Sequence, residues 1–333
     1  MAQLSQQITV NFETLLRQWS PRDAQPLIEA IQRKRAGRKL LCVVFNEALP
    51  LPTILAPPAI LPFGKLLSRL GKLPKLDLFL RSTGGITEVP WRMVSLLREF
   101  AEELGVIVPT FALSGATHIA LAADDLLLTP FSMLGSVDPT RNHPLLPKDA
   151  EGKPIPVSVQ DLKHCIQFIQ EQLGQSYSNQ NLALIISELF KYVNPLAIGA
   201  LEQSYSLSKL ITRKVLQTRK TPLSEEQVGK IEELLAGKYF SHSFPISRSE
   251  VESELGLPVT KPDAELSDLI SALEQFYTDE FQRVMPATPS SPEPTFRVGA
   301  FMQIATEGWA IGQFAKDNQL LADPWLELPP RQR

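Results

Sequence analysis

Short apolar runs alternate with helix-like segments through the first part of the chain. Two such runs, at 39–45 (KLLCVVF) and 76–80 (LDLFL), have the length of strands. A continuous apolar run of that length predicts a strand buried on both faces, as in a parallel sheet. Apolar residues recur at helical spacing over 64–71 and 90–104. Strands alternating with helices over 40–135 indicate βαβ units, so we expect an α/β fold with a mainly parallel sheet flanked by helices.

Helical spacing dominates much of the remaining chain. Residues 1–37 form an N-terminal helical pattern, and 157–240 contains a long expected helix at 195–218. The prolines of 48–63 exclude regular structure there, which predicts a loop. The other expected segments are strands at 106–112 and 125–129, a surface loop at 141–156, strand character at 243–260 and a closing helix at 264–283.

The C-terminal region changes composition. Residues 285–295 (MPATPSSPEPT) are rich in proline and serine, which predicts a linker. The segment 296–328 beyond it still carries several aromatic residues, more than a disordered tail normally contains. We therefore expect an N-terminal helical extension at 1–38, a core domain at 39–284, and a linker with a tail at 285–333.

Composition excludes several classes of protein. The 333 residues are 44% hydrophobic, so the chain can bury a large core and wholesale disorder is excluded. The 33 basic and 36 acidic residues give a net charge of −3, which offers no global attraction for nucleic acid or an anionic membrane. Two cysteines exclude a disulfide scaffold. The four histidines show no metal-ligand spacing, and no Gly-x-Gly-x-x-Gly follows a strand, so we expect neither a metal nor another cofactor.

The sequence offers no obvious membrane or export signal. The N-terminus lacks a basic segment followed by an apolar core, so we expect a cytoplasmic protein. The most apolar long window, 106–128, is interrupted by Pro109, His118 and Asp124. A spanning helix would bury those groups in lipid at high cost, so we interpret the window as a strand, a turn and a core helix.

Two predicted strand-to-helix junctions place small residues where a helix begins. One is 82–85 (STGG) and the other is 112–117 (ALSGAT), which contains Ser114. Free backbone amides at such a position favour an oxyanion, and both junctions would lie at the carboxyl ends of parallel strands. Together they predict a nucleophilic Ser114 beside an amide-lined anion site. Taken singly, a serine at this position is more often a helix cap, and a glycine pair more often a turn.

Longer motifs around these junctions resemble a known superfamily, the fold shared by Clp protease, crotonase and signal-peptide peptidase A. They are DLFLRSTGGITEVPWRMVSLLREF at 77–100 and PTFALSGATHIALAADDLLLTPFSMLGSVDP at 109–139. With the segments 193–216 and 236–259, they are most similar to the serine dehydrogenase proteinase family, soluble relatives of that peptidase. The resemblance covers about 40–280 and implies stacked ββα units, a peptide or protein substrate, and assembly into a homo-oligomer.

The resemblance also implies residue roles. Ser114 falls on the peptidase nucleophile, and the amides of Gly84 and Gly85 fall on the oxyanion-hole loop, with Gly115 as a further donor. A serine nucleophile needs a base, and relatives of the peptidase use a lysine from a later segment. Lys191 stands at roughly that position, before a proline-initiated helix, and Lys214 is the alternative. The chain departs from the family pattern at Thr83, where a proline is usual, at Arg81 and at Ala116.

Three further residues are candidates for supporting roles. His118 lies four residues after Ser114 on the same helical face, although a histidine in an apolar helix is more often a hydrogen-bonded core residue. Asp138 would orient a base or simply form the turn before Pro139. His242 lies in a segment typical of the family, where we expect a structural or interface role.

The leading hypothesis is an ATP-independent serine peptidase of the signal-peptide peptidase A type. A second hypothesis is an inactive oligomeric scaffold that binds a protein partner through the tail beyond 285. The third is a crotonase-type acyl-CoA enzyme, since TFALSGATHIALAADD also resembles a crotonase helix start.

Overall fold

The computed structural model describes residues 24–138, 145–146, 148–153, 155, 159–173, 179–239, 244–288, 291–305 and 308–328. His242 and most of the expected helix at 1–37 lie outside these residues, as does part of the loop expected at 141–156. The part of that helix that is described is α2 (Gln25–Lys34).

The predicted parallel sheet is confirmed. Its parallel strands follow the spatial order β1-β2-β3-β5-β8. Alternate residues of each strand face opposite helical layers, which explains why the buried stretches of β1 to β5 carry apolar residues on both faces. The bounds are β1 (Lys39–Phe45), β2 (Leu73–Arg81), β3 (Ala101–Val108), β5 (Asp125–Leu128) and β8 (Val259–Thr260). Across β1, β2, β3 and β5, one row of paired residues faces one helical layer and comprises Leu41, Leu78, Val106 and Leu126. The adjacent row faces the other layer and comprises Cys42, Phe79, Ile107 and Leu127.

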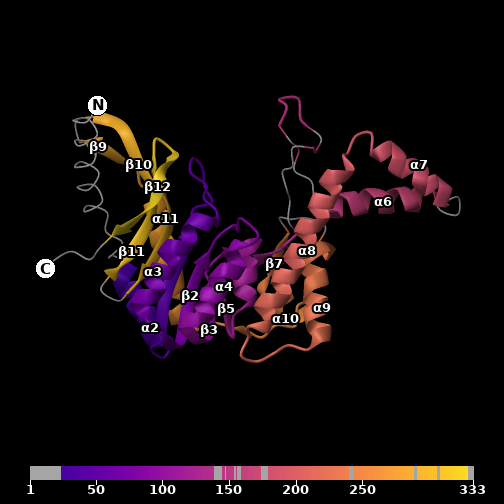
Figure 1. Cartoon of the computed structure of the whole chain (residues 1–333). Helices are drawn as coiled ribbons and strands as arrows, with labels where there is room; N and C mark the ends of the chain where they lie inside the picture. The colour runs from indigo at the N-terminus through magenta and orange to yellow at the C-terminus, as the bar shows by residue number, and fades with distance from the viewer. Residues whose placement is uncertain are drawn as a thin grey trace.

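Helices cover both faces of the sheet (Figure 1). On one face α3 (Ile60–Leu70), α4 (Val89–Phe100) and α5 (Gly115–Leu121) pack in succession. On the other, α2 packs against α11 (Ala264–Gln282). The helix expected at 90–104 ends at Phe100, because the residues after it pair with β2 as the start of β3.

The C-terminal segment does not form a separate tail. β10 (Ser291–Ile304) pairs antiparallel with β1, and β11 (Ala310–Lys316) and β12 (Gln319–Leu328) extend the same sheet (Figure 1). The linker expected at 285–295 is therefore wrong as a description of its backbone: β9 (Met285–Thr288) pairs with β10. Its prolines are tolerated because this hairpin lies at the margin of the sheet, where strand amides need no further partner.

The remaining elements follow β5. Figure 1 shows α6 and α7 extending away from the sheet beyond α8. A small second sheet has the strand order β4-β6-β7. No helix among the described residues is long and apolar enough to cross a membrane. The bounds are β4 (Phe111–Ala112), β6 (Met133–Gly135), β7 (Pro245–Ser247), α6 (Val159–Leu173), α7 (Asn179–Leu189), α8 (Pro195–Gln217), α9 (Glu225–Glu233) and α10 (Arg248–Ser253).

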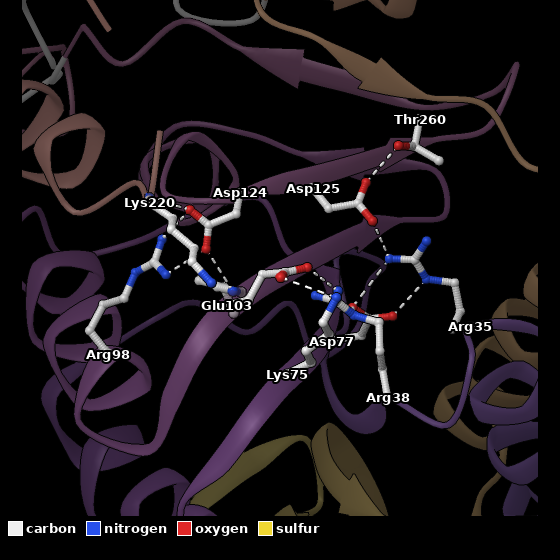
Figure 2. A network of polar contacts seen from close by, with 11 residues as sticks. Arg35, Arg38, Lys75, Asp77, Arg98, Glu103, Asp124, Asp125, Lys220 and Thr260 are labelled. Atoms are coloured by element: carbon white, nitrogen blue, oxygen red, sulfur yellow. Dashed lines mark hydrogen bonds and ion pairs between the residues drawn. The ribbon is translucent and has the colours of Figure 1, made fainter. Parts of the chain in front are cut away.

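A buried charge network fastens α2 to the sheet (Figure 2). Arg35 Nε lies 2.7 Å and Arg38 Nε 2.5 Å from the two carboxylate oxygens of Asp77, which is 1% exposed. Arg35 also lies 2.5 Å from Asp125, and Thr260 donates a hydrogen bond to that carboxylate. Burial acts to raise the pKa of Asp125, but the hydrogen bonds from Thr260 and Arg35 outweigh it and hold the pKa below its usual value.

Candidate active site

Ser114 occupies a strained turn between β4 and α5. Its backbone has φ 50° and ψ −120°, a conformation that a residue with a Cβ rarely adopts. Such strain costs about 1–3 kcal/mol and persists only where the surroundings enforce it. The Thr117 hydroxyl donates to the Ala112 carbonyl and accepts from the Gly135 amide, which ties the turn to β4 and β6. Ser114 is half-buried, and its side chain does not cap the helix.

Gly84 lets the loop after β2 approach this turn. A Cβ on Gly84 would lie 2.7 Å from the Gly115 nitrogen and 2.8 Å from the Ser114 Cβ, so no side chain fits. The φ of Gly84 is also 98°, which favours glycine. The amide of Gly84 is occupied, because it donates to Ser82 Oγ at 3.0 Å. Gly84 therefore provides space at the site rather than a free donor.

Two amides near Ser114 remain available. Within the described part of the chain, the N–H groups of Gly85 and Gly115 donate no hydrogen bond. They lie close together, since a Cβ on Gly115 would be 3.5 Å from the Gly85 nitrogen. A pair of free amides beside a serine hydroxyl is the arrangement that stabilises an oxyanion. Among the three glycines predicted for this role, the geometry favours Gly85 and Gly115.

The loop after β1 forms one wall of the site. Leu55 donates its amide to the Gly84 carbonyl and accepts from Ile86, each at 2.8 Å, so the loop pairs with the glycine segment. The Thr53 hydroxyl donates to the carbonyl of Gly299 in β10, which anchors the loop to the C-terminal strands. The pocket thus enclosed has a volume of about 180 Å³. Its lining comprises Ile54, Thr83, Gly84, Gly85, Thr87, Ser114, Gly115, His118, Val137 and Ser208.

His118 lies in this pocket and is 2% exposed. Its Nε2 is 3.1 Å from the Thr212 hydroxyl of α8. Burial lowers the pKa of His118 to about 4, with the Ser208 carbonyl opposing that shift, so the ring is neutral at pH 7. The sequence placed His118 near Ser114, and both residues line the same pocket.

The other predicted residues lie elsewhere. Lys191 forms an exposed ion pair with Glu188 and does not line the pocket. Lys214 also lies outside the pocket lining, with its Nζ 5.0 Å from the centre of the Trp91 ring. Asp138 is buried just after β6, where its amide donates to Ser136 Oγ, and it does not line the pocket. Among the described residues, no group of acidic, cysteine or histidine side chains could hold a metal.

Sequence reasoning missed Ser208, Ile54 and Val137. Ser208 is fully buried in α8, where the pattern of apolar positions offers no sign of it. The sequence does contain one sign of a buried polar face on this helix. It is the helical spacing of Ser204, Ser208 and Thr212, since three polar side chains on one buried face need partners from a neighbouring element.

The parallel sheet, with a serine turn and glycine loop at the carboxyl ends of its strands, has the α/β architecture expected for a Clp protease-like fold. Within that class, residues 69–147 match the model of the ClpP-like SDH-type serine proteinase family. The resemblance seen in the motifs is confirmed over this segment, which contains Gly84, Gly85 and Ser114.

Two curated relatives are also similar. An uncharacterized protein of Methanocaldococcus jannaschii is 26% identical over 202 residues, covering 61% of this chain and 58% of the relative. A second uncharacterized protein of the same organism is 30% identical over 120 residues, covering 34% of this chain and 40% of the relative. The chain thus spans about half the length of the curated relatives it matches.

Two solved structures share the arrangement more distantly. A membrane-bound stomatin-specific protease is 11% identical with a TM-score of 0.38, covering 71% of this chain and 84% of that one. ClpP1 from Listeria monocytogenes is 12% identical with a TM-score of 0.36, covering 73% of this chain and 98% of that one.

Proposed function

We propose that the protein is a serine peptidase in which Ser114 is the nucleophile. The observation that carries the proposal is the position of Ser114, held on a strained turn beside two amides that donate no hydrogen bond to any described residue. The hydroxyl oxygen attacks the carbonyl carbon of a peptide bond, and the amides of Gly85 and Gly115 stabilise the resulting oxyanion. The serine hydroxyl proton passes to the leaving nitrogen, so collapse of that intermediate breaks the C–N bond and releases an amine. Water then hydrolyses the acyl-enzyme, which releases a carboxylic acid and restores the Ser114 hydroxyl.

The proposal does not include a lysine base from the described chain. Lys191 and Lys214 both lie outside the pocket lining, and each has another contact that accounts for its position. The family match supports a serine protease without naming the residues of this chain that perform the reaction.

A fluorophosphonate probe, which reacts covalently with activated serines, tests the proposal. We expect the purified protein to be labelled at Ser114 and to cleave a fluorogenic peptide, and Ser114→Ala to lose both activities. Ser206→Ala is the matched control, because Ser206 is exposed on α8 and its hydroxyl donates to the neighbouring Glu202. Undiminished cleavage by Ser114→Ala would exclude Ser114 as the nucleophile.

The proposed enzyme acts as a homo-oligomer, as the family resemblance implies. Apolar side chains on the two projecting helices support this, since Phe168 of α6 is 60% exposed and Leu184 of α7 is 66% exposed. Sedimentation equilibrium of the full chain tests it, and a monomer at micromolar concentration would contradict it. The segment beyond 285 forms strands of the main sheet, so the scaffold alternative cannot rely on a free tail there.

A further inference from the structure

The buried end of the pocket is polar. Of its lining residues, Val137, His118 and Ser208 are the most deeply placed side chains, with exposed fractions of 3%, 2% and 0%. His118 is one helical turn after Ser114, and side chains of an α-helix lean toward its N-terminus. The imidazole therefore extends beneath the serine turn. We call these three residues the pocket floor.

One tautomer of His118 satisfies both contacts of the Thr212 hydroxyl. That hydroxyl donates its single proton to the Ser208 carbonyl at 3.1 Å. With the ring hydrogen on Nε2, the hydroxyl oxygen accepts from Nε2 at 3.1 Å, so we assign this tautomer to His118. Nδ1 is then a lone-pair acceptor. It is buried and has no hydrogen-bond partner among the described residues.

Ser208, which is fully buried, adds no free donor to the floor. Its hydroxyl donates its proton to the Val137 carbonyl at 2.6 Å. The polar side chains of the floor thus contain acceptors and no free donor, and His118 Nδ1 is the acceptor without a partner among the described residues. A buried acceptor without a partner is unfavourable, so the floor is complementary to a group that donates hydrogen bonds.

We infer that this pocket receives the substrate side chain preceding the scissile bond and selects a small uncharged side chain that donates a hydrogen bond, asparagine above all. The inference rests on the proposed function, because it takes Ser114 as the attacking residue. The volume of about 180 Å³ is below the range of most cofactor sites and suits a single side chain. An apolar side chain leaves Nδ1 unpaired, and a carboxylate places further acceptors and a charge against the floor.

Three peptides that differ only at this position test the inference. Their residues are asparagine, aspartate and leucine, whose side chains contain equal numbers of heavy atoms. We expect kcat/KM for the asparagine peptide to exceed that for each of the others by at least about tenfold, because a site built to hydrogen-bond discriminates strongly against analogues that lack the bond. Equal rates, or a preference for leucine or aspartate, would overturn the inference.

Variants of the floor separate a specificity role from a structural one. The ratio of kcat/KM for two substrates does not depend on the fraction of enzyme that is folded. His118→Phe removes the acceptor while keeping a ring, and we expect the asparagine-to-leucine ratio to fall toward one. Thr212→Val removes the group that fixes the tautomer, so the aspartate peptide should gain relative to asparagine. Ser206→Ala should leave both ratios unchanged. Unchanged ratios in His118→Phe would contradict the inference.

Failure of the inference is distinguishable from failure of the proposed function. Fluorophosphonate labelling requires Ser114 and the amides but no side chain in the pocket. Loss of labelling at Ser114 overturns both. Labelling at Ser114 without turnover of any of the three peptides, or with the wrong order of preference, overturns the inference alone.

Discussion

Gly84 and Ser114 are in direct contact, so that a Cβ on Gly84 would stand 2.8 Å from the Cβ of Ser114. The two residues come from different strand-to-helix junctions, and their contact brings the glycine loop onto the serine turn. The site therefore requires a residue without a side chain at position 84 as well as the hydroxyl of Ser114.

Gly84→Ala should inactivate the protein and destabilise it. The new Cβ overlaps the serine turn, and alanine is strained at a φ of 98°. We expect a loss of about 1–3 kcal/mol in the free energy of unfolding, measured in urea, together with loss of fluorophosphonate labelling. Gly64→Ala in α3 is the control, since a Cβ there meets nothing within 4 Å and favours the helix by about 0.5–1 kcal/mol. Normal labelling of Gly84→Ala would show that this contact is dispensable.

Gly115→Ala should affect turnover more than folding. Its Cβ would lie 3.5 Å from the Gly85 nitrogen and 3.0 Å from Pro90 Cγ, so the methyl group crowds the space between the two donor amides. Obstructing one oxyanion donor costs about 10²–10³ in kcat. A loss of kcat in steady-state kinetics, together with an unchanged melting temperature, would support the assignment of Gly115 as an oxyanion donor. Wild-type kcat would remove Gly115 from the oxyanion site.

Acid should destabilise the protein through His118. Its pKa is about 4 when folded and 6.5 in the unfolded chain, so between these values the unfolded state binds the extra proton. Stability is therefore retained above pH 6.5 and lost as pH falls toward 4, by about 2 kcal/mol between pH 7 and pH 4.5. Buried carboxylates with lowered pKa values, such as Asp124, add a loss of the same sign. In His118→Phe, the free energy of unfolding, measured in urea at several pH values, should fall less steeply between pH 7 and pH 4.5. The same pH dependence as in the wild type would show that His118 makes no contribution.

Asp77→Asn should strongly destabilise the fold without altering the site. It would leave two buried guanidinium groups, those of Arg35 and Arg38, without their shared carboxylate. Breaking a buried pair costs about 3–5 kcal/mol, and because Arg35 keeps Asp125 and Arg38 keeps Glu103, we expect a loss at the lower end of that range. Lys65→Ala removes the exposed pair with Glu327 and should cost no more than about 1 kcal/mol. Chemical denaturation gives the free energy of unfolding of both variants. Similar losses in Asp77→Asn and Lys65→Ala would contradict the prediction.

Phe301→Ala should destabilise the whole protein, because β10 lies inside the sheet. The Phe301 ring is fully buried, 5.8 Å from Tyr277 and 5.7 Å from Phe281 of α11. Truncating a buried phenylalanine costs about 3–5 kcal/mol. Leu320→Ala in β12 is the control, since that side chain is 46% exposed. One cooperative transition with a lowered midpoint is expected, whereas an unaffected core would show that the C-terminal strands fold independently.

The sequence predicted the central parallel strands well, because β1, β5 and the buried halves of β2 and β3 are apolar runs. Strand β1 was expected at the residues where it occurs, Lys39–Phe45. The C-terminal strands were not predicted. Their pairing with β1 depends on residues more than 200 positions away, and proline and serine over 285–295 gave the opposite local signal.

The site was predicted in part for similar reasons. Ser114 and the glycines are local features of two junctions, so their motifs were visible in the sequence. The sequence did not show which backbone amides are free. The hydrogen bond from the Gly84 amide to Ser82 Oγ depends on the folded geometry of the loop and has no signature in the motif. Lys191 and Lys214 were chosen by their positions along the chain. Chain position does not show where a side chain lies, and Lys191 is in an exposed ion pair with Glu188.

The hydrogen bond from Thr53 to Gly299 has a consequence for biosynthesis. The two residues are 246 positions apart, and the bond anchors the loop that forms one wall of the pocket. A ribosome must therefore translate the message as far as Gly299 before that wall can be fixed. A nascent chain already carries Ser114 and both glycine donors but has no completed pocket around them. Translation itself thus delays the assembly of the proposed site until strand β10 has emerged.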